Sequence, residues 1–217
     1  MVYGEVNKTP AIPREEPVAI PGPAGMLEAR WAAPEDLVPT CCAVICHPHP
    51  LYGGTMDNKV VTTLVRTAAA LGAATVRFNF RGVGASEGRH DEGHGETGDV
   101  LAVIDWSAGR WPGATLWLCG FSFGAYVALA AASRRTVERL VTVAPPLRRM
   151  DVESLVLPRC PWLIVQGSAD ELVDSVEVQS WAHSLSPPPG VAVLSGASHF
   201  FHGRLAELGA AVASFLR

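Results

Sequence analysis

The stretch Ala114–Ser133, ATLWLCGFSFGAYVALAAAS, decides the fold that this sequence predicts. A short apolar segment, Thr115–Cys119, runs into GFSFG at Gly120–Gly124, and an alanine-rich segment follows. This order matches a G-x-S-x-G pattern in which the serine lies on a sharp turn between a strand and a helix. Small residues are required beside that turn because strand and helix approach closely. The stretch therefore predicts strand, tight turn and helix, with Ser122 as a candidate nucleophile.

Length, composition and charge narrow the class of protein. A chain of 217 residues is compatible with one domain, and we expect a single domain over residues 1–217, with 1–17 as a poorly ordered tail or an edge extension. With 48% hydrophobic and 18% charged residues, the chain suits a sheet covered on both faces. The net charge is −4 and no Lys/Arg cluster occurs, which argues against nucleic acid and anionic membranes as partners.

The first residues and the cysteines indicate the cellular compartment. MVYGEVNKTPAIPREEP has no apolar core and is acidic where a signal peptide is basic, and no apolar run approaches a membrane span. We therefore expect a cytoplasmic protein. Three of the five cysteines share the run Cys41–Cys46, and we expect all five to be reduced thiols, mostly buried. No C-x-x-C pattern suggests zinc.

Apolar strand-like runs alternate with helical stretches along the chain. This alternation predicts an α/β fold with a mostly parallel sheet, right-handed crossovers and helices on both faces. We find neither a repeat nor an internal domain boundary. The expected strands are Val18–Ile20, Met26–Trp31, Cys41–Cys46, Ala74–Phe80, Thr115–Cys119, Leu140–Val143, Trp162–Val165 and Val191–Leu194. The expected helices are Asp57 or Asn58 to Leu71, Thr97–Ala108, one after Ser122, Ser175–Ser184 and Arg204–Leu216.

Three polar residues follow three different expected strands. Ser122, Asp170 and His199 each come just after a carboxyl end, where parallel sheets bind ligands. A serine hydroxyl needs an adjacent base, and the base needs an acid to orient it. We therefore expect Ser122 as nucleophile, His199 as base and Asp170 as acid.

Other residues compete for these roles. GASEG at Gly84–Gly88 repeats the serine pattern, but a polar, glycine-rich segment follows it, so we interpret Ser86 as a loop residue. Asp174 looks like a helix cap rather than the acid. We expect His202 to open the last helix or to face solvent. We expect His90, His94 and His183 to lie on the solvated surface.

Two backbone N–H groups are needed to stabilise a developing oxyanion. One is expected from Phe123, at the start of the helix after the nucleophile. The other is expected from the loop after the third strand, where Pro48 and Pro50 have no N–H. This leaves His49 and Leu51, and the sequence does not separate them.

Metal and nucleotide sites are not expected. His47 and His49 would make a metal pair, but no third ligand is near them in the sequence. Gly82 and Gly84 start a glycine pattern whose third glycine is replaced by Glu87, and no G-x-x-x-x-G-K-[ST] occurs. We therefore expect neither a metal ion nor a cofactor.

Five motifs distributed over most of the chain resemble the α/β-hydrolase superfamily. They are HPHPLYGGTMDNKVV at His47–Val61, FNFRGVGASEG at Phe78–Gly88, GFSFG at Gly120–Gly124, QGSADELV at Gln166–Val173 and GASHFF at Gly196–Phe201. The nearest resemblance is to a small, lidless bacterial group related to dienelactone hydrolases and serine carboxylesterases. It implies an α/β-hydrolase fold without a cap domain. It also implies a triad of Ser122, Asp170 and His199, with Phe123 and the His49/Leu51 loop as oxyanion donors.

Two departures from that pattern refine the expected activity. Dienelactone hydrolases use a cysteine nucleophile, so Ser122 indicates ester hydrolysis instead. Lipases insert a lid where only Pro145–Arg159 is available here, which favours short-chain esters. We expect a serine carboxylesterase acting on a small-molecule ester, as a monomer or dimer. A thioesterase, a small-peptide or amide hydrolase, and a non-catalytic binding module remain alternatives. Phe200-Phe201 either lines the pocket or packs against the last helix, and packing is favoured.

Overall fold

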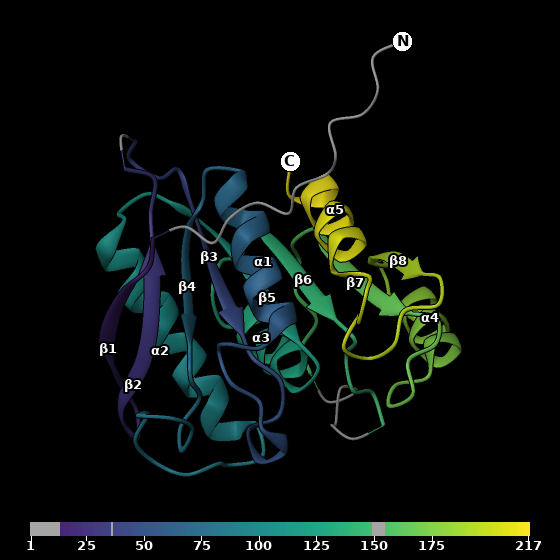
Figure 1. Cartoon of the computed structure of the whole chain (residues 1–217), viewed down its shortest axis with the longest axis horizontal. Coiled ribbons are helices and arrows are strands. Elements are labelled where there is room, and N and C mark those ends of the chain that lie inside the picture. Colours follow the sequence, from purple (N-terminus) through teal and green to yellow (C-terminus); the bar gives the residue numbers. More distant parts are fainter. Residues whose placement is uncertain (1–13, 36, 149–154) are drawn as a thin grey trace.

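Within the described residues, one mixed sheet of eight strands runs through the molecule in the order β1-β2-β4-β3-β5-β6-β7-β8 (Figure 1). The structure is a computed structural model that describes residues 14–35, 37–148 and 155–217, so the expectation for residues 1–13 lies outside it. The strands are β1 (Glu16–Gly22), β2 (Gly25–Ala32), β3 (Cys41–Cys46), β4 (Ala74–Phe78), β5 (Thr115–Phe121), β6 (Arg139–Val143), β7 (Trp162–Gly167) and β8 (Gly190–Leu194). The helices are α1 (Lys59–Ala70), α2 (His94–Arg110), α3 (Phe123–Ala132), α4 (Ser175–Ser184) and α5 (Leu205–Leu216), with a 3-10 turn η1 (Pro50–Tyr52).

The strand pairing confirms a mostly parallel sheet. Strands β3 to β8 pair in parallel, whereas β1 and β2 form an antiparallel hairpin that joins β4. Strand β3 lies between β4 and β5, so the chain reverses its direction across the sheet there. Parallel sheets bind ligands at such a reversal, outside the carboxyl ends of the strands. The loops after β3 and β5 therefore start side by side.

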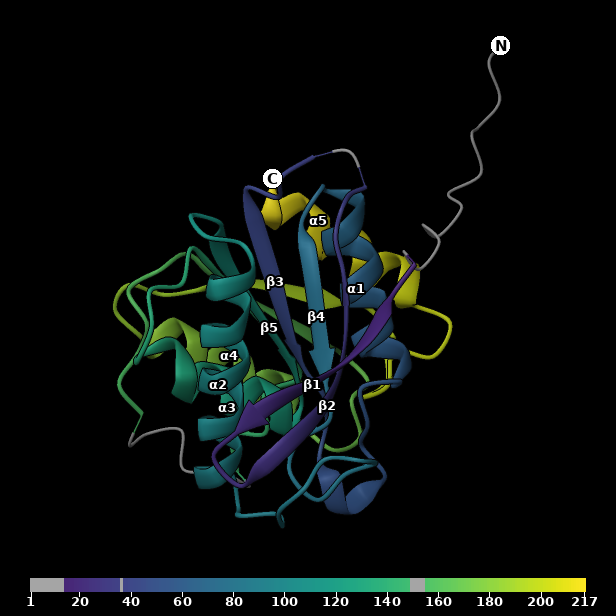
Figure 2. The same ribbon diagram turned by 90° about the vertical axis from the view of Figure 1, so that its left-hand side faces the viewer.

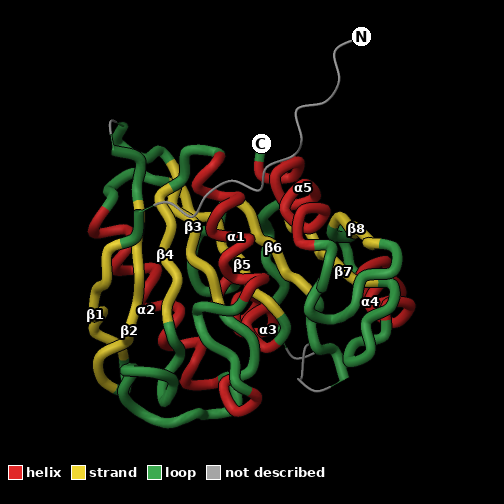
Figure 3. The backbone as a smooth tube through the Cα atoms, in the orientation of Figure 1, coloured by secondary structure: helices red, strands yellow, loops and turns green. Residues whose placement is uncertain are grey.

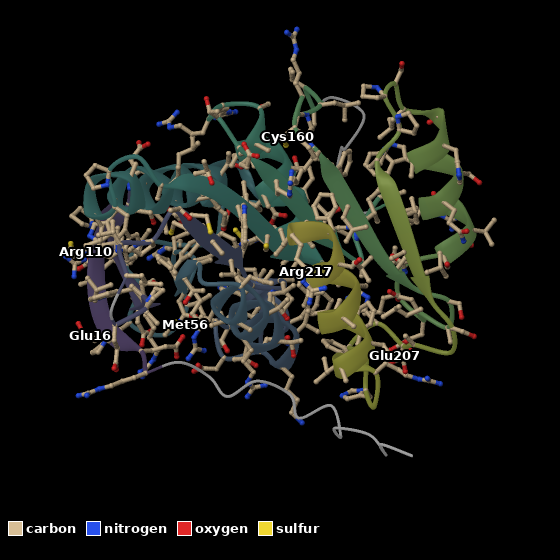
Figure 4. The ribbon with its side chains drawn as sticks, turned by 90° about the horizontal axis from the view of Figure 1, so that it is seen from above. Glu16, Met56, Arg110, Cys160, Glu207 and Arg217 are labelled. Atoms are coloured by element: carbon tan, nitrogen blue, oxygen red, sulfur yellow. The ribbon has the colours of Figure 1, made fainter. Side chains whose placement is uncertain are left out.

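Helices cover both faces of the sheet, as expected. Helices α1 and α5 pack on one face and α2, α3 and α4 on the other (Figures 1 and 2). Val44 of β3 belongs to the core under α2 and α3, and its neighbour Ile45 belongs to the core under α1. This double burial explains why all of Cys41–Cys46 is apolar, since neither face meets water. The guanidinium of Arg110 lies 4.4 Å over the ring of Trp31 and holds α2 against β2 (Figure 4).

Among residues 14–35, 37–148 and 155–217, no cap domain lies over the carboxyl ends of the strands. The connection from β6 to β7 covers residues 144–161, of which the structure describes 144–148 and 155–161. Loops gather along the edge of the sheet where β3, β5 and β7 end (Figure 3). Among the described residues, no helix combines the length and apolar character needed to cross a membrane.

Most element boundaries differ from the sequence prediction by one to three residues, and three of the differences bear on the site or on the N-terminal segment. Helix α2 begins at His94 rather than Thr97, because the Glu96 carboxylate accepts the Gly93 N–H at 2.9 Å and caps the helix early. Strand β4 ends at Phe78 rather than Phe80, whose N–H instead donates to His47 Nε2 at 3.0 Å. Strand β1 begins at Glu16 rather than Val18. The last two residues of the 1–17 segment therefore extend the edge strand of the sheet, which was one of the two expectations for that segment.

All five cysteines have free thiols, in agreement with the sequence prediction. Four are buried and Cys160 is half-buried, near the end of the β6–β7 connection (Figure 4). Burial raises the pKa of Cys42 and of Cys119 to about 12. These thiols are therefore protonated and behave as small apolar side chains.

Candidate active site

The turn between β5 and α3 holds Ser122 in a strained backbone conformation. Ser122 has φ +54° and ψ −119°, which few residues other than glycine adopt. Its N–H donates to the carbonyl of Val143 in β6 at 2.8 Å. A Cβ atom at Gly120 would lie 2.1 Å from the carbonyl oxygen of Gly124, and one at Gly124 would lie 2.5 Å from that of Cys46. The predicted need for small residues at this turn is therefore confirmed.

The structure brings Ser122, His199 and Asp170 into one chain of hydrogen bonds. Oγ of Ser122 lies 3.1 Å from Nε2 of His199, and Nδ1 of His199 lies 2.9 Å from Oδ2 of Asp170. The side chains of His199 and Asp170 are 3% and 0% exposed, so water does not compete for their contact. Ser122 follows β5, Asp170 follows β7 and His199 follows β8, as the sequence predicted.

The Asp170 carboxylate is held by several donors. Its Oδ1 accepts the N–H groups of Leu172 and Val173, both at 2.8 Å, and its Oδ2 accepts Nε2 of Gln166 at 3.0 Å. Burial acts to raise the pKa of Asp170, but these N–H groups and the hydrogen bond and charge of His199 outweigh it. The pKa therefore stays below its usual value, and the carboxylate is charged at neutral pH.

Aromatic rings and a neighbouring carboxylate fix the position of His199. Its ring centroid lies 5.1 Å from that of Phe121 and 5.2 Å from that of Phe200, and its N–H donates to Oε2 of Glu171 at 3.1 Å. Phe201 is fully buried and packs against the last helix, as favoured from the sequence. For Phe200 that expectation is wrong, since its side chain lines the pocket beside Ser122.

The loop after β3 places His49 beside the start of α3. Phe123 N–H is the first amide of α3, and such amides have no partner inside their own helix. The ring of His49 lies 4.8 Å from the ring of Phe123, and both residues line the pocket. The N–H of Leu51, the other sequence candidate, already donates to Nδ1 of His49 at 3.2 Å.

His47 ties the loop after β3 to the end of β4. Its Nδ1–H donates to the Pro48 carbonyl at 2.6 Å, and its Nε2 accepts the N–H of Phe80 at 3.0 Å. Both ring nitrogens are thus engaged in protein hydrogen bonds. Burial lowers the pKa of His47 to about 4, so the ring is neutral at pH 7. This arrangement gives His47 a structural role.

The second serine pattern has a structural use. Ser86 Oγ donates to the carbonyl of Asn79 at 2.7 Å and accepts the N–H of Glu28 at 2.9 Å. Ser86 is a buried residue of a largely exposed loop, and the sequence interpretation of a loop residue is confirmed. The side chain of Asp174 accepts the N–H groups of Val176 and Glu177 and caps α4. The interpretation of Asp174 as a helix cap is therefore confirmed.

Most of the competing histidines lie where the sequence predicted. His94, His183 and His202 are exposed. For His90 the expectation of a solvated ring is wrong. Its side chain is 9% exposed, its Nδ1 lies 2.8 Å from Oε1 of the buried Glu96, and its ring packs 5.0 Å from that of His49. The early cap of α2 explains this, because Glu96 also accepts the N–H of Asp91 and folds the loop inward.

A pocket of about 490 Å³ opens onto Ser122 and His199. Sequence reasoning did not find most of its walls, because they come from loops that the fold brings together. The polar segment RHDEGHGE, which contributes Glu92, was the one available signal. The remaining lining residues are Pro48, His49, Tyr52, Gly53, Gly54, Asn58, Glu92, Phe123, Pro146, Leu172 and Phe200.

The sheet order and the strained serine turn define an α/β serine hydrolase without a lid. The model of the X-Pro dipeptidyl-peptidase (S15) family matches residues 26–157, and the chain belongs to this family. XC6422 from Xanthomonas campestris, an α/β serine hydrolase without a lid, is 41% identical, with a TM-score of 0.89 over 94% of each chain. An α/β serine hydrolase homologue from Coxiella burnetii is 48% identical, with a TM-score of 0.89 over 93% of this chain and 97% of that one. Uncharacterized protein RP471 of Rickettsia prowazekii is 34% identical over 90% of this chain and 86% of its own.

Proposed function

We propose that this protein hydrolyses short-chain carboxylic esters through an acyl-enzyme on Ser122. The observation that carries the proposal is the hydrogen-bond chain from Asp170 through His199 to Ser122, which ends in an open pocket. A serine in such a chain has a base within reach, and the base has a carboxylate that fixes its tautomer.

In the first half of the reaction, Oγ of Ser122 attacks the ester carbonyl carbon while its proton moves to Nε2 of His199. The carbonyl oxygen becomes an oxyanion, and we assign the N–H groups of Phe123 and His49 to bind it. The observation in favour of His49 is its position, since its ring packs 4.8 Å from that of Phe123 and both residues line the pocket. The tetrahedral intermediate then collapses, the ester C–O bond breaks, and His199 gives the proton to the departing alcohol oxygen.

In the second half, water attacks the acyl carbon and gives a proton to His199. The bond between the acyl carbon and Oγ breaks, the carboxylic acid leaves, and the proton returns to Ser122. Throughout, the charged Asp170 stabilises the imidazolium that forms on His199.

The pocket supports small acyl groups. Its volume is about 490 Å³, and the described part of the chain contains no cap domain that closes it. The same residues would cleave a thioester or a small amide, and the S15 family model favours the amide as the second candidate. A panel of p-nitrophenyl esters of increasing chain length, acyl-CoA thioesters and aminoacyl anilides ranks these substrates by kcat/KM. We expect the shortest esters to rank first.

A fluorophosphonate probe tests the nucleophile directly. We expect labelling of the wild-type protein and of Ser86→Ala, and none of Ser122→Ala. Ser86→Ala is the matched control because Ser86 occupies the same sequence pattern. Labelling of Ser122→Ala at the wild-type rate, with the label elsewhere, would overturn the assignment.

A further inference from the structure

The pocket beside Ser122 carries negative charge on one wall. Among the described residues that line it, Glu92 supplies the one carboxylate, and none is lysine or arginine. Leu172 and Phe200, which also line the pocket, are apolar. An anionic substrate would therefore meet a carboxylate with no cation to balance it, whereas a cationic substrate would find a partner.

Glu92 is an exposed carboxylate at the pocket rim, with 78% of its side chain open to solvent and His90 as its neighbour. Its backbone is in the left-handed region, with φ +49°, directly before the cap of α2. Its Oε1 lies 3.6 Å from Nε2 of His90, whose Nδ1 lies 2.8 Å from the buried Glu96. This group has two carboxylates and one imidazole.

Aromatic rings complete an environment for an ammonium group. Tyr52 and His49 pack with centroids 4.8 Å apart, and both line the pocket with Phe123. The Tyr52 side chain is exposed, so one face of its ring is open to a ligand. A cation bound near aromatic faces and a carboxylate gains from both the ring quadrupole and the charge. Neutral or anionic groups gain from neither.

The contacts of Glu92 also indicate which half of the ester it meets. His199 must donate a proton to the leaving alcohol, so the alcohol lies on the side of His199 and Phe200. Glu92 belongs to the other side, since His90 packs against His49 and Phe123 with centroids 5.0 and 5.5 Å apart. We place the acyl group towards this wall, because the leaving group occupies the side of His199.

We propose that Glu92 is a specificity-determining residue that selects esters whose acyl part carries an ammonium group. The proposal rests on the ester hydrolysis argued above and adds a substrate class to it. The Glu92 carboxylate pairs with the ammonium group, and the rings of Tyr52 and His49 flank it. The chemistry at Ser122 is the same for all acyl groups.

Two p-nitrophenyl esters with the same leaving group isolate the effect of charge. One is the ester of γ-trimethylammoniobutyric acid, and the other is its neutral isostere, in which tert-butyl replaces trimethylammonium. We expect the wild-type enzyme to prefer the cationic ester by about tenfold in kcat/KM, as for a partly screened ion pair with a cation–π contact. Glu92→Gln should abolish the part of this preference that the enzyme supplies. The kcat/KM ratio of the two esters should then equal about the ratio of their rates of hydrolysis without enzyme. Raising the ionic strength should weaken the wild-type preference, because salt screens exposed charges.

Asp91→Asn is the matched control, since Asp91 is the adjacent exposed carboxylate and does not line the pocket. It should keep the wild-type preference. Equal preference in wild type and Glu92→Gln, with both enzymes hydrolysing the neutral ester, would overturn the role of Glu92 and leave ester hydrolysis standing. Failure of the wild-type enzyme to hydrolyse either ester, or p-nitrophenyl acetate, would instead overturn the proposed function.

Discussion

Nδ1 of His199 lies 2.9 Å from Oδ2 of Asp170, and both side chains are buried. The contact fixes the ring so that Nε2 faces Ser122, because Nδ1 carries the proton that points to the carboxylate. An uncharged replacement of the same shape would permit the opposite tautomer, in which Nε2 carries a proton and cannot accept one.

Asp170→Asn is therefore expected to lower kcat for p-nitrophenyl acetate by about 10⁴-fold, with a much smaller change in KM. Asp174→Asn is the control, because asparagine also caps a helix and Asp174 contacts α4 rather than His199. It should keep wild-type kcat. Equal losses of kcat in the two variants would show that Asp170 supports the fold rather than His199. Circular dichroism spectra of both variants show whether they are folded.

Replacement of Gly124 by alanine should destabilise the protein. The new Cβ would lie 2.5 Å from the carbonyl oxygens of Cys46 and His47, and these are backbone atoms that cannot rotate away. We expect the free energy of unfolding to fall by about 1–3 kcal/mol, as for other overpacked cores. Urea denaturation measures this change.

The control for that experiment is Gly109→Ala. Gly109 lies in α2, and a Cβ there would meet nothing within 4 Å. Alanine should therefore raise the free energy of unfolding by about 0.5–1 kcal/mol, since it favours the helix. A Gly124→Ala protein as stable as wild type would contradict the close approach of α3 to the loop after β3.

His47 should make the fold sensitive to mild acid. Burial lowers its pKa from 6.5 to about 4, so between these values the unfolded chain binds a proton that the folded chain does not. The contribution of neutral His47 to the free energy of unfolding is complete above pH 6.5, the pKa of the unfolded chain. It is lost as the pH falls below that value, by roughly 2 kcal/mol between pH 7 and pH 5. The pKa of Asp170 is also lowered, but its loss of stability begins only below its ordinary value of 3.8, outside this window.

Comparison of wild type with His47→Gln isolates this contribution. Glutamine does not titrate, yet its side-chain oxygen can accept the N–H of Phe80. Urea denaturation at pH 7 and pH 5 should show a smaller acid loss for the variant, by roughly 2 kcal/mol. Identical losses in the two proteins would assign the acid sensitivity to other groups.

The fold could be predicted from the sequence because its strands are buried on both faces. Cys41–Cys46 has no polar position, and such runs alternate with helices along most of the chain. Ser122, Asp170 and His199 were found for a related reason, since each lies in the loop or turn after a strand and parallel strands end at one edge. The structure places these side chains together, and their catalytic roles remain our proposal.

The walls of the pocket could not be predicted in the same way. His90 and Glu92 lie in a polar segment whose composition is typical of a solvated loop. Glu96 changes that outcome by capping α2 and drawing His90 under His49. Such a contact depends on tertiary structure, and no local pattern carries it. The left-handed backbone conformation of Glu92 could not be predicted from the sequence either.

The position of β3 between β4 and β5 has a consequence for the evolution and engineering of this molecule. The loop after β3 and the serine turn after β5 are adjacent because these two strands pair. The connection from β6 to β7 is not needed to align them, and among its described residues Pro146 reaches the pocket. That connection is thus a natural insertion point. A segment grafted there would change which acyl groups enter while the reacting atoms keep their places.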